Sequence, residues 1–105
     1  MEKIVRQGIL YDFYGELLTG HQKEVYEMLV IENLSQSEIA DRLSITRQAV
    51  HDVIKRIDGI LESYETRLGL VSRFESVRVL IDRLEALTVT GSEEHKLCEE
   101  IKELL

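Results

Sequence analysis

The chain has 105 residues, of which 44% are hydrophobic, and its formal net charge is −7. This length suits one domain with a core of moderate size. The absence of proline, the small number of glycines and the lack of a sustained apolar–polar alternation favour long helices and exclude a β-sheet. Met1 is followed by Glu2 and Lys3, and no apolar run approaches the ~20 residues that span a bilayer. We therefore expect no signal peptide, no membrane insertion and a cytoplasmic location.

The chemistry-bearing side chains do not form a reactive or metal-binding motif. Cys98 is the one cysteine, which fits a reducing compartment, and we expect it to be a passive helix residue. His21, His51 and His95 share no ligand spacing with each other or with Cys98. Glycine-rich phosphate loops, nucleophile elbows and paired inward carboxylates are also missing from the sequence. We expect no metal, no cofactor and no enzymatic activity.

The first two helices are predicted from apolar spacing and a helix cap. A first helix is expected over residues 2–18, because its apolar residues recur every three or four positions. Thr19–Gln22 has the pattern of a capping box, with a threonine at the cap and a glutamine three residues later. A second helix is therefore predicted from about Gly20 to Asn33. The apolar face of the first helix consists of Ile9 or Leu10, Phe13, Tyr14, Leu17 and Leu18.

A third and a fourth helix follow, separated by a short turn. Ser35–Glu38 is a second capping box, and it predicts a helix from about Gln36 to Leu43. Thr46 caps a fourth helix, which begins at Arg47 and meets no clear stop before Gly69. Its apolar residues then form a heptad seam: Ile54, Ile57, Leu61, Tyr64, Leu68 and Val71. This seam can pack on the N-terminal helix or form a homodimer, and its length favours the homodimer.

The remaining residues predict a C-terminal helical extension. Phe74, Val77, Ile81 and Leu84 continue the heptad spacing beyond a break at Gly69. A loop is expected over Thr88–Gly91, and Ser92 can cap a last helix. Its apolar residues are Leu97, Ile101, Leu104 and Leu105, whereas the pairs Glu93–Glu94 and Glu99–Glu100 suit a solvated face. We predict one all-α domain over residues 1–105, with a helix-turn-helix unit at about 20–57 and an extension at about 58–105.

The stretch from Gln36 to Lys55 has the spacing of a helix-turn-helix. Six residues have the required type at the required offset: Ile39, Ala40, Leu43, Ile45, Val50 and Val53. Ala40 lies where the two helices cross, and Ile45 is expected to fill the turn. Ser44 occupies a position where glycine often supplies a positive φ, so either Ser44 is strained or the turn differs. Tyr11, Tyr14, Tyr26 and Tyr64 fall on apolar faces, and we expect them in the core rather than stacked on bases.

The polar side chains around the second helix of this unit suit double-stranded DNA. A helix in the major groove needs donors and acceptors near its N-terminus. Arg47 could contact a guanine edge or a phosphate, Gln48 an adenine, and Lys55 a phosphate. Asp52 opposes phosphate, so it would face a cytosine amine, an arginine or solvent. The candidate DNA-binding residues are Ser35, Gln36, Thr46, Arg47, Gln48, His51, Asp52, Lys55 and Arg56.

Charge leaves a second interpretation open. An acidic chain is a poor polyanion binder as a whole. Residues 35–58 carry four basic and four acidic side chains, so this segment has no net charge. It is less acidic than the rest of the chain, but it is not a basic patch. Helix-turn-helix cores also occur in units that bind protein or RNA. The alternative to DNA binding is therefore an accessory protein that binds another partner.

Two resemblances refine these expectations. Residues 17–57 resemble the promoter-binding region 4 of bacterial sigma factors, through Leu17–Thr19, Leu34–Ala40 and Leu43. A more specific resemblance, to the YlxM family of helix-turn-helix proteins of Gram-positive bacteria, is carried by Asp12–Thr19, Thr46–Asp52, Ile54–Arg56 and Tyr64–Leu70. That resemblance implies an all-α DNA-binding regulator with a part in the signal recognition particle pathway, a link that rests on neighbouring genes. In the alternative, the partner would be the targeting GTPase, its receptor or the particle RNA.

Overall fold

The computed structural model describes residues 2–105, and its regular secondary structure over that range is entirely helical. This confirms the predicted all-α class. The elements in chain order are α1 (Lys3–Tyr14), the 3-10 turn η1 (Gly15–Leu17), α2 (Gly20–Val30), α3 (Gln36–Leu43), α4 (Arg47–Leu68), α5 (Leu70–Ala86) and α6 (Glu93–Leu104). No helix in the described range is both long and apolar enough to cross a membrane.

The chain divides after Gly69 into two compact units. As predicted, α4 continues unbroken through Gly59 and ends only at Leu68, before Gly69. Gly59 is exposed and a side chain there would meet open space, so the helix tolerates it. Gly69 ends α4 in the left-handed region, at φ 62°, where glycine carries no steric penalty.

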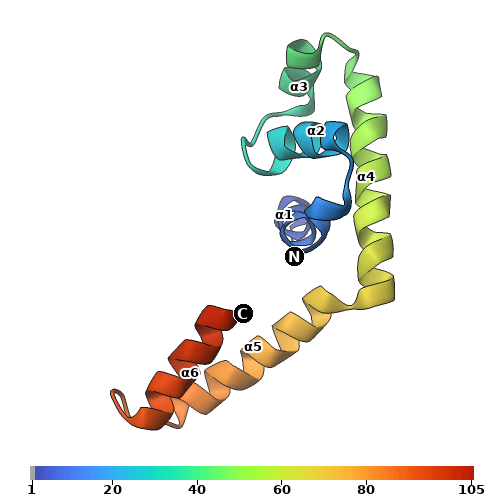
Figure 1. Cartoon of the computed structure of the whole chain (residues 1–105). Helices are drawn as coiled ribbons and strands as arrows, with labels where there is room; N and C mark the ends of the chain where they lie inside the picture. Colours follow the sequence, from blue (N-terminus) through green and yellow to red (C-terminus); the bar gives the residue numbers. More distant parts are fainter. Residues whose placement is uncertain (1) are drawn as a thin grey trace. The chain divides into compact units, whose positions relative to one another are not determined.

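In the N-terminal unit, α1, α2 and α3 lie along one side of α4 (Figure 1). Ile54, Ile57 and Leu61 of the heptad seam are at most 3% exposed inside this unit. Of the two interpretations of the seam, packing on the N-terminal helices therefore holds for these three residues. The core of this unit consists of Leu10, Tyr14, Leu18, Val25, Tyr26, Met28, Ile39, Ala40, Val50, Ile54, Ile57 and Leu61.

Two helices end earlier than predicted. The first was expected to reach residue 18, but α1 ends at Tyr14 and tightens into η1. Gly15 lies against the Tyr11 ring, where an added Cβ would come within 2.8 Å of a ring carbon. The second was expected to reach Asn33, but α2 ends at Val30, and Asn33 adopts a left-handed conformation with φ 56°. Asparagine tolerates this region better than most residues, so the chain can turn there, three residues beyond the end of α2.

The predicted caps are confirmed. Thr19 Oγ1 accepts from the Gln22 amide at 3.2 Å, and Gln22 Oε1 accepts from the Thr19 amide at 3.0 Å. Ser35 and Glu38 form the same reciprocal pair, at 3.1 and 3.0 Å. The hydrogen bond from the Ser35 backbone N–H lowers the pKa of the Glu38 carboxyl. These bonds satisfy amide groups that have no partner inside their helices, which explains why the starts of α2 and α3 were predictable.

The predicted tyrosine positions fall on interior faces of the N-terminal unit. Tyr14 and Tyr26 are at most 1% exposed, whereas Tyr11 and Tyr64 are half-buried. Tyr11 lies with its ring centroid 5.7 Å from that of Tyr26, and Tyr64 lies 6.0 Å from Tyr14. The rings therefore pack on one another within the unit, as predicted, rather than forming an open stacking surface.

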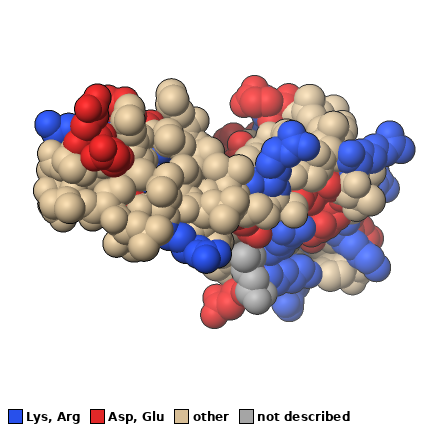
Figure 2. All heavy atoms as spheres, turned by 90° about the horizontal axis from the view of Figure 1, so that it is seen from below, with Lys and Arg blue, Asp and Glu red and all other residues tan. Residues whose placement is uncertain are grey.

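The C-terminal unit is a hairpin of α5 and α6. Ser92 caps α6 by accepting from the His95 amide at 3.2 Å, and Cys98 is 3% exposed, as expected for a passive residue. Lys102 joins the two helices through Glu85 at 3.1 Å. Figure 2 shows a broad surface over this unit without acidic or basic side chains. The exposed large apolar residues of this unit are Leu70, Val79, Leu80, Leu84, Leu87, Val89, Leu97, Ile101, Leu104 and Leu105.

Candidate nucleic-acid interface

The first half of α4 is fixed by its contact with α3. Ile39 and Val50 are fully buried and Ala40 is 5% exposed, so three of the six predicted helix-turn-helix positions form the contact between the helices. Leu43 and Val53 are half-buried. One expectation is wrong: Ile45 is 43% exposed and therefore does not fill the turn.

The sequence left two possibilities for this turn, a strained Ser44 or a different turn geometry, and the structure has the strained Ser44. Ser44 adopts φ 57° and ψ 42°, the left-handed conformation that glycine usually supplies. Its amide donates to the Asp41 carbonyl at 3.4 Å, and the Ile45 amide donates to the Ala40 carbonyl at 3.1 Å. Thr46 Oγ1 then accepts from the Ala49 amide at 3.0 Å and starts α4. Three residues are thus sufficient to reverse the chain.

The side chains predicted to point outward from α4 are all exposed. They are Thr46, Arg47, Gln48, His51, Asp52, Lys55 and Arg56. Arg47, Lys55 and Arg56 make no ion pair within residues 2–105, so their positive charges are available to a partner. The fold therefore places a polar, partly cationic face at the start of α4 while the opposite face of the helix holds the core.

Asp52 is held by a neighbour on the same helix. Gln48 Nε2 donates to Asp52 Oδ1 at 2.9 Å, one turn apart. This bond orients both side chains and leaves one amide hydrogen and the carbonyl oxygen of Gln48 unused. Without a partner bound, Asp52 is therefore exposed to solvent and also accepts from the Gln48 amide.

Ser35 and Gln36 reach the same region from the start of α3. The Ser35 oxygen is used in its capping box, and its hydroxyl hydrogen remains free to donate. Gln36 is half-buried and lines a cavity of about 360 Å³ together with Arg47, Gln48 and His51. The structure therefore brings Gln36 to the α4 face, whereas Ser35 is exposed but does not line this cavity.

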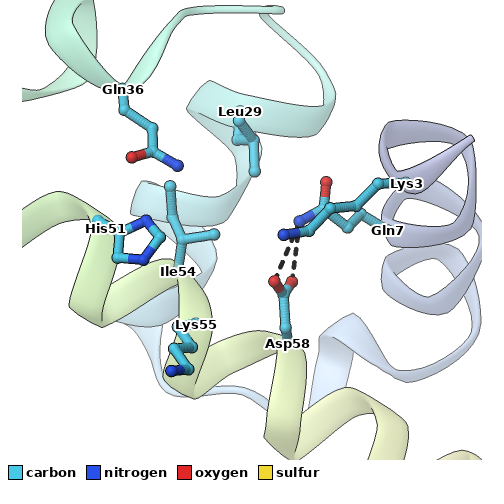
Figure 3. Close-up of a pocket in the computed structure, with 8 residues that line it drawn as sticks. All are labelled: Lys3, Gln7, Leu29, Gln36, His51, Ile54, Lys55 and Asp58. Atoms are coloured by element: carbon cyan, nitrogen blue, oxygen red, sulfur yellow. Dashed lines mark hydrogen bonds between the residues drawn. The ribbon is translucent and has the colours of Figure 1, made fainter.

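A second cavity, of about 400 Å³, adjoins this face and includes two residues that sequence analysis missed. Lys3 and Gln7 of α1 line it, opposite His51 and Lys55 of α4 (Figure 3). Only the packing of α1 across α4 brings them there, and no local pattern indicates it. Among the described residues, no three His, Cys, Asp or Glu side chains are grouped as metal ligands.

Comparison with known proteins identifies one family over nearly the whole chain. Residues 1–102 match the family model described as "Putative helix-turn-helix protein, YlxM / p13 like". A UPF0122 protein of Oceanobacillus iheyensis is 40% identical over 104 residues, covering 99% of this chain and 98% of that protein. One of Exiguobacterium sibiricum is 42% identical over 95 residues, covering 90% and 89%, and one of Bacillus thuringiensis is 38% identical over 105 residues, covering 100% and 93%.

Proposed function

This chain belongs to the UPF0122 family of YlxM/p13-like proteins, and on that premise we propose that it is a regulatory protein that binds double-stranded DNA through α4. The observation that carries the proposal is the exposure of Arg47 and Gln48 at the start of a helix whose other face is locked by Ile39 and Val50. Such a helix can enter a major groove without moving any part of the core.

The roles follow from the donors that each side chain offers. Arg47 can donate two bonds to a guanine edge, and Gln48 can pair with an adenine once it leaves Asp52. Asp52 then accepts from a cytosine amine. Lys55 and Arg56 suit phosphates, as do the Ser35 hydroxyl, the Gln36 amide and the start of α4 at Thr46. His51 lies between the two groups and can donate to either.

Selection from a pool of random duplexes, followed by affinity measurements at several salt concentrations, tests this proposal. Three phosphate contacts per protomer give a log–log slope of roughly −3 for a monomer and roughly −5 for a dimer. Arg47→Ala should cost about 1–3 kcal/mol and relax the preference at one base pair. Lys96→Ala is the matched control, since it removes one exposed charge from α6. Failure to select any sequence, or binding that ignores salt, would refute DNA binding.

We also propose that the protein acts as a homodimer, with the hairpin as its interface. A hairpin of two helices has no third layer to cover its apolar residues, and Leu80, Leu87 and Leu97 are each more than half exposed. The charges of the hairpin also suit a second copy. Arg73 and Arg83 of α5 make no ion pair within the described range, and the glutamates of α6 are exposed, so the cations of one copy could pair with the glutamates of the other. A dimer would also engage two half-sites at once.

Sedimentation distinguishes this interface from the heptad seam. Leu97→Glu should halve the mass without unfolding the chain, because Leu97 is 52% exposed. Ile31→Glu is the matched control, since Ile31 is 62% exposed but lies in the N-terminal unit. If the unmodified chain is a monomer at all accessible concentrations, the dimer proposal fails, and DNA binding would then rest on one half-site.

The alternative partner is a component of the protein-targeting machinery: its GTPase, the receptor or the particle RNA. The acidic face of α6, with Glu93, Glu94, Glu99 and Glu100 exposed, would suit a basic protein surface. Recovery of these components on the immobilised protein after nuclease treatment, lost when two of these glutamates are replaced by glutamine, would favour this function over DNA binding.

A further inference from the structure

The second cavity is built by all four helices of the N-terminal unit. Figure 3 shows Leu29 from α2, Gln36 from α3 and His51 from α4 directed toward a common space, with Lys3 and Gln7 extending from α1 on the other side. At about 400 Å³ the space lies in the range of small-ligand sites. The lining residues are Lys3, Gln7, Leu29, Gln36, His51, Ile54, Lys55 and Asp58.

The one carboxylate in this lining is already occupied. Asp58 accepts two hydrogen bonds from Gln7 Nε2, at 3.0 and 3.1 Å, and a third from the Tyr26 hydroxyl at 2.5 Å. Lys3 and Lys55 form no ion pair with it or with any other described residue. The cavity therefore carries two unpaired ammonium groups and an imidazole against a single carboxylate whose hydrogen-bonding capacity is largely used.

Three other cations of the same unit are paired, whereas Arg47 and Arg56 of α4 are not. Arg6 is bound by Glu62 at 3.1 Å, Lys23 by Glu16 at 3.1 Å and Arg42 by Glu32 at 2.8 Å. In a chain of net charge −7, acidic partners are plentiful. Lys3 of α1 and Lys55 of α4 differ from the other unpaired cations in that they line one cavity together, and they give it a positive potential within an acidic protein.

We propose that this cavity is a phosphate-binding site, in which Lys3 from α1 and Lys55 and His51 from α4 hold one phosphate group. The ammonium groups and the imidazole N–H donate to phosphate oxygens, and the Gln36 amide can donate a further bond. Leu29 and Ile54 form the apolar wall of the cavity, while Lys3, His51 and Lys55 are exposed and can be reached by a phosphate from solvent.

The phosphate can come from two sources with the same chemistry. One is the backbone of a duplex, which rests on the proposed DNA-binding function, because this cavity shares Gln36 and His51 with the cavity at the start of α4. In that case α1 adds a contact that a helix-turn-helix alone would lack. The other is a small phosphorylated molecule, which would compete with DNA for His51 and Lys55.

The duplex source is tested with Lys3→Gln, which lies outside the residues proposed above to contact DNA. Loss of one phosphate contact should make the log–log salt slope less negative by about 1 per protomer and weaken all sequences alike. Lys3→Arg should retain the slope. Lys96→Gln makes the same change of charge in α6 and should leave the slope unchanged. A thermal melt of each variant shows whether it is folded.

The small-molecule source is tested without DNA. Inorganic phosphate and pyrophosphate are titrated at constant ionic strength while the amide signals of Gln7, Gln36 and His51 are followed by NMR. Saturable shifts that Lys3→Gln weakens at least tenfold would support the site with a free phosphate. If Lys3→Gln changes the salt slope of DNA binding but free phosphate causes no such shifts, the site binds the phosphates of a duplex. If Lys3→Gln alters neither the salt slope nor the NMR shifts, the phosphate site is refuted, even where the unmodified chain binds DNA. If the unmodified chain binds no duplex, the titration with free phosphate alone decides.

Discussion

Tyr26→Phe is a sharp test of the polar contact that joins α1, α2 and α4. The Tyr26 side chain is fully buried, and its hydroxyl donates to Asp58. Burial, followed by the hydrogen bond to Asp58 and the negative charge of that carboxylate, raises the pKa of Tyr26 above its ordinary value of 10. The substitution removes one oxygen atom and leaves the ring, so it isolates this interaction from packing.

The magnitude has two parts. At neutral pH, loss of a hydrogen bond to a charged acceptor should lower the free energy of unfolding by about 1.5–3 kcal/mol, while Gln7 still holds Asp58. Above pH 10 an unfolded tyrosine loses its proton and the folded Tyr26 keeps it, so the unfolded state binds fewer protons. The stability that Tyr26 contributes is therefore complete below pH 10, and it falls by about 1.4 kcal/mol per pH unit above it.

Urea unfolding of both chains at about pH 7, 10 and 11 measures these terms, with tyrosinate absorbance as a direct record of ionisation. The difference in the free energy of unfolding between the unmodified chain and Tyr26→Phe should be constant up to about pH 10. Above that pH the difference should become smaller. Tyr64→Phe is the control, because Tyr64 is half-buried and its hydroxyl makes no hydrogen bond among the described residues. A difference that stays the same at every pH would refute the claim that Tyr26 remains protonated in the folded chain.

Three further predictions concern the α3–α4 region and the core beneath α1. Ser44→Gly should raise the melting temperature, since it relieves a left-handed serine that costs about 1 kcal/mol. Thr46→Ala should cost about 1 kcal/mol in urea unfolding through loss of the cap to Ala49, whereas Thr90→Ala in the exposed loop should not. Leu61→Ala should cost about 2–5 kcal/mol and leave the sedimenting mass unchanged, because Leu61 is buried within one chain.

Helix starts and the α3–α4 contact were predictable because they depend on neighbours in sequence. The capping boxes at Thr19 and Ser35 need only residues three positions apart. Ala40 and Val50 are likewise placed by a short turn. Helix ends were less predictable, since the turn that follows α2 uses a left-handed conformation at Asn33, which asparagine adopts only in some contexts.

The partner of the heptad seam could not be deduced because periodicity describes one side of a contact. Ile54, Ile57 and Leu61 present the same pattern to an intramolecular helix and to a second copy. Part of the seam packs on α1. The buried face of α1 is hard to recognise in the sequence because it includes Gln7, a polar residue that is only 7% exposed. Gln7 is buried because Asp58, 51 positions away, accepts from its amide. Such a long-range pair leaves no periodic signal in either helix.

The acidic composition argued against a polyanion partner. The positions of the carboxylates weaken that argument, because several of them make contacts within the N-terminal unit. In the second half of α4, Asp58, Glu62 and Glu65 accept hydrogen bonds from side chains of α1 and α2. These negative charges are used inside the unit and are partly neutralised there. The first half of the same helix keeps Arg47 and Lys55 unpaired. Because exposed charges are screened over about 8 Å at physiological salt, a phosphate at the first half responds mainly to the local charges, which are these two cations, Arg56 and the opposing Asp52. Net charge is therefore a weak guide to the partners of this chain, and the local arrangement along α4 is a better one.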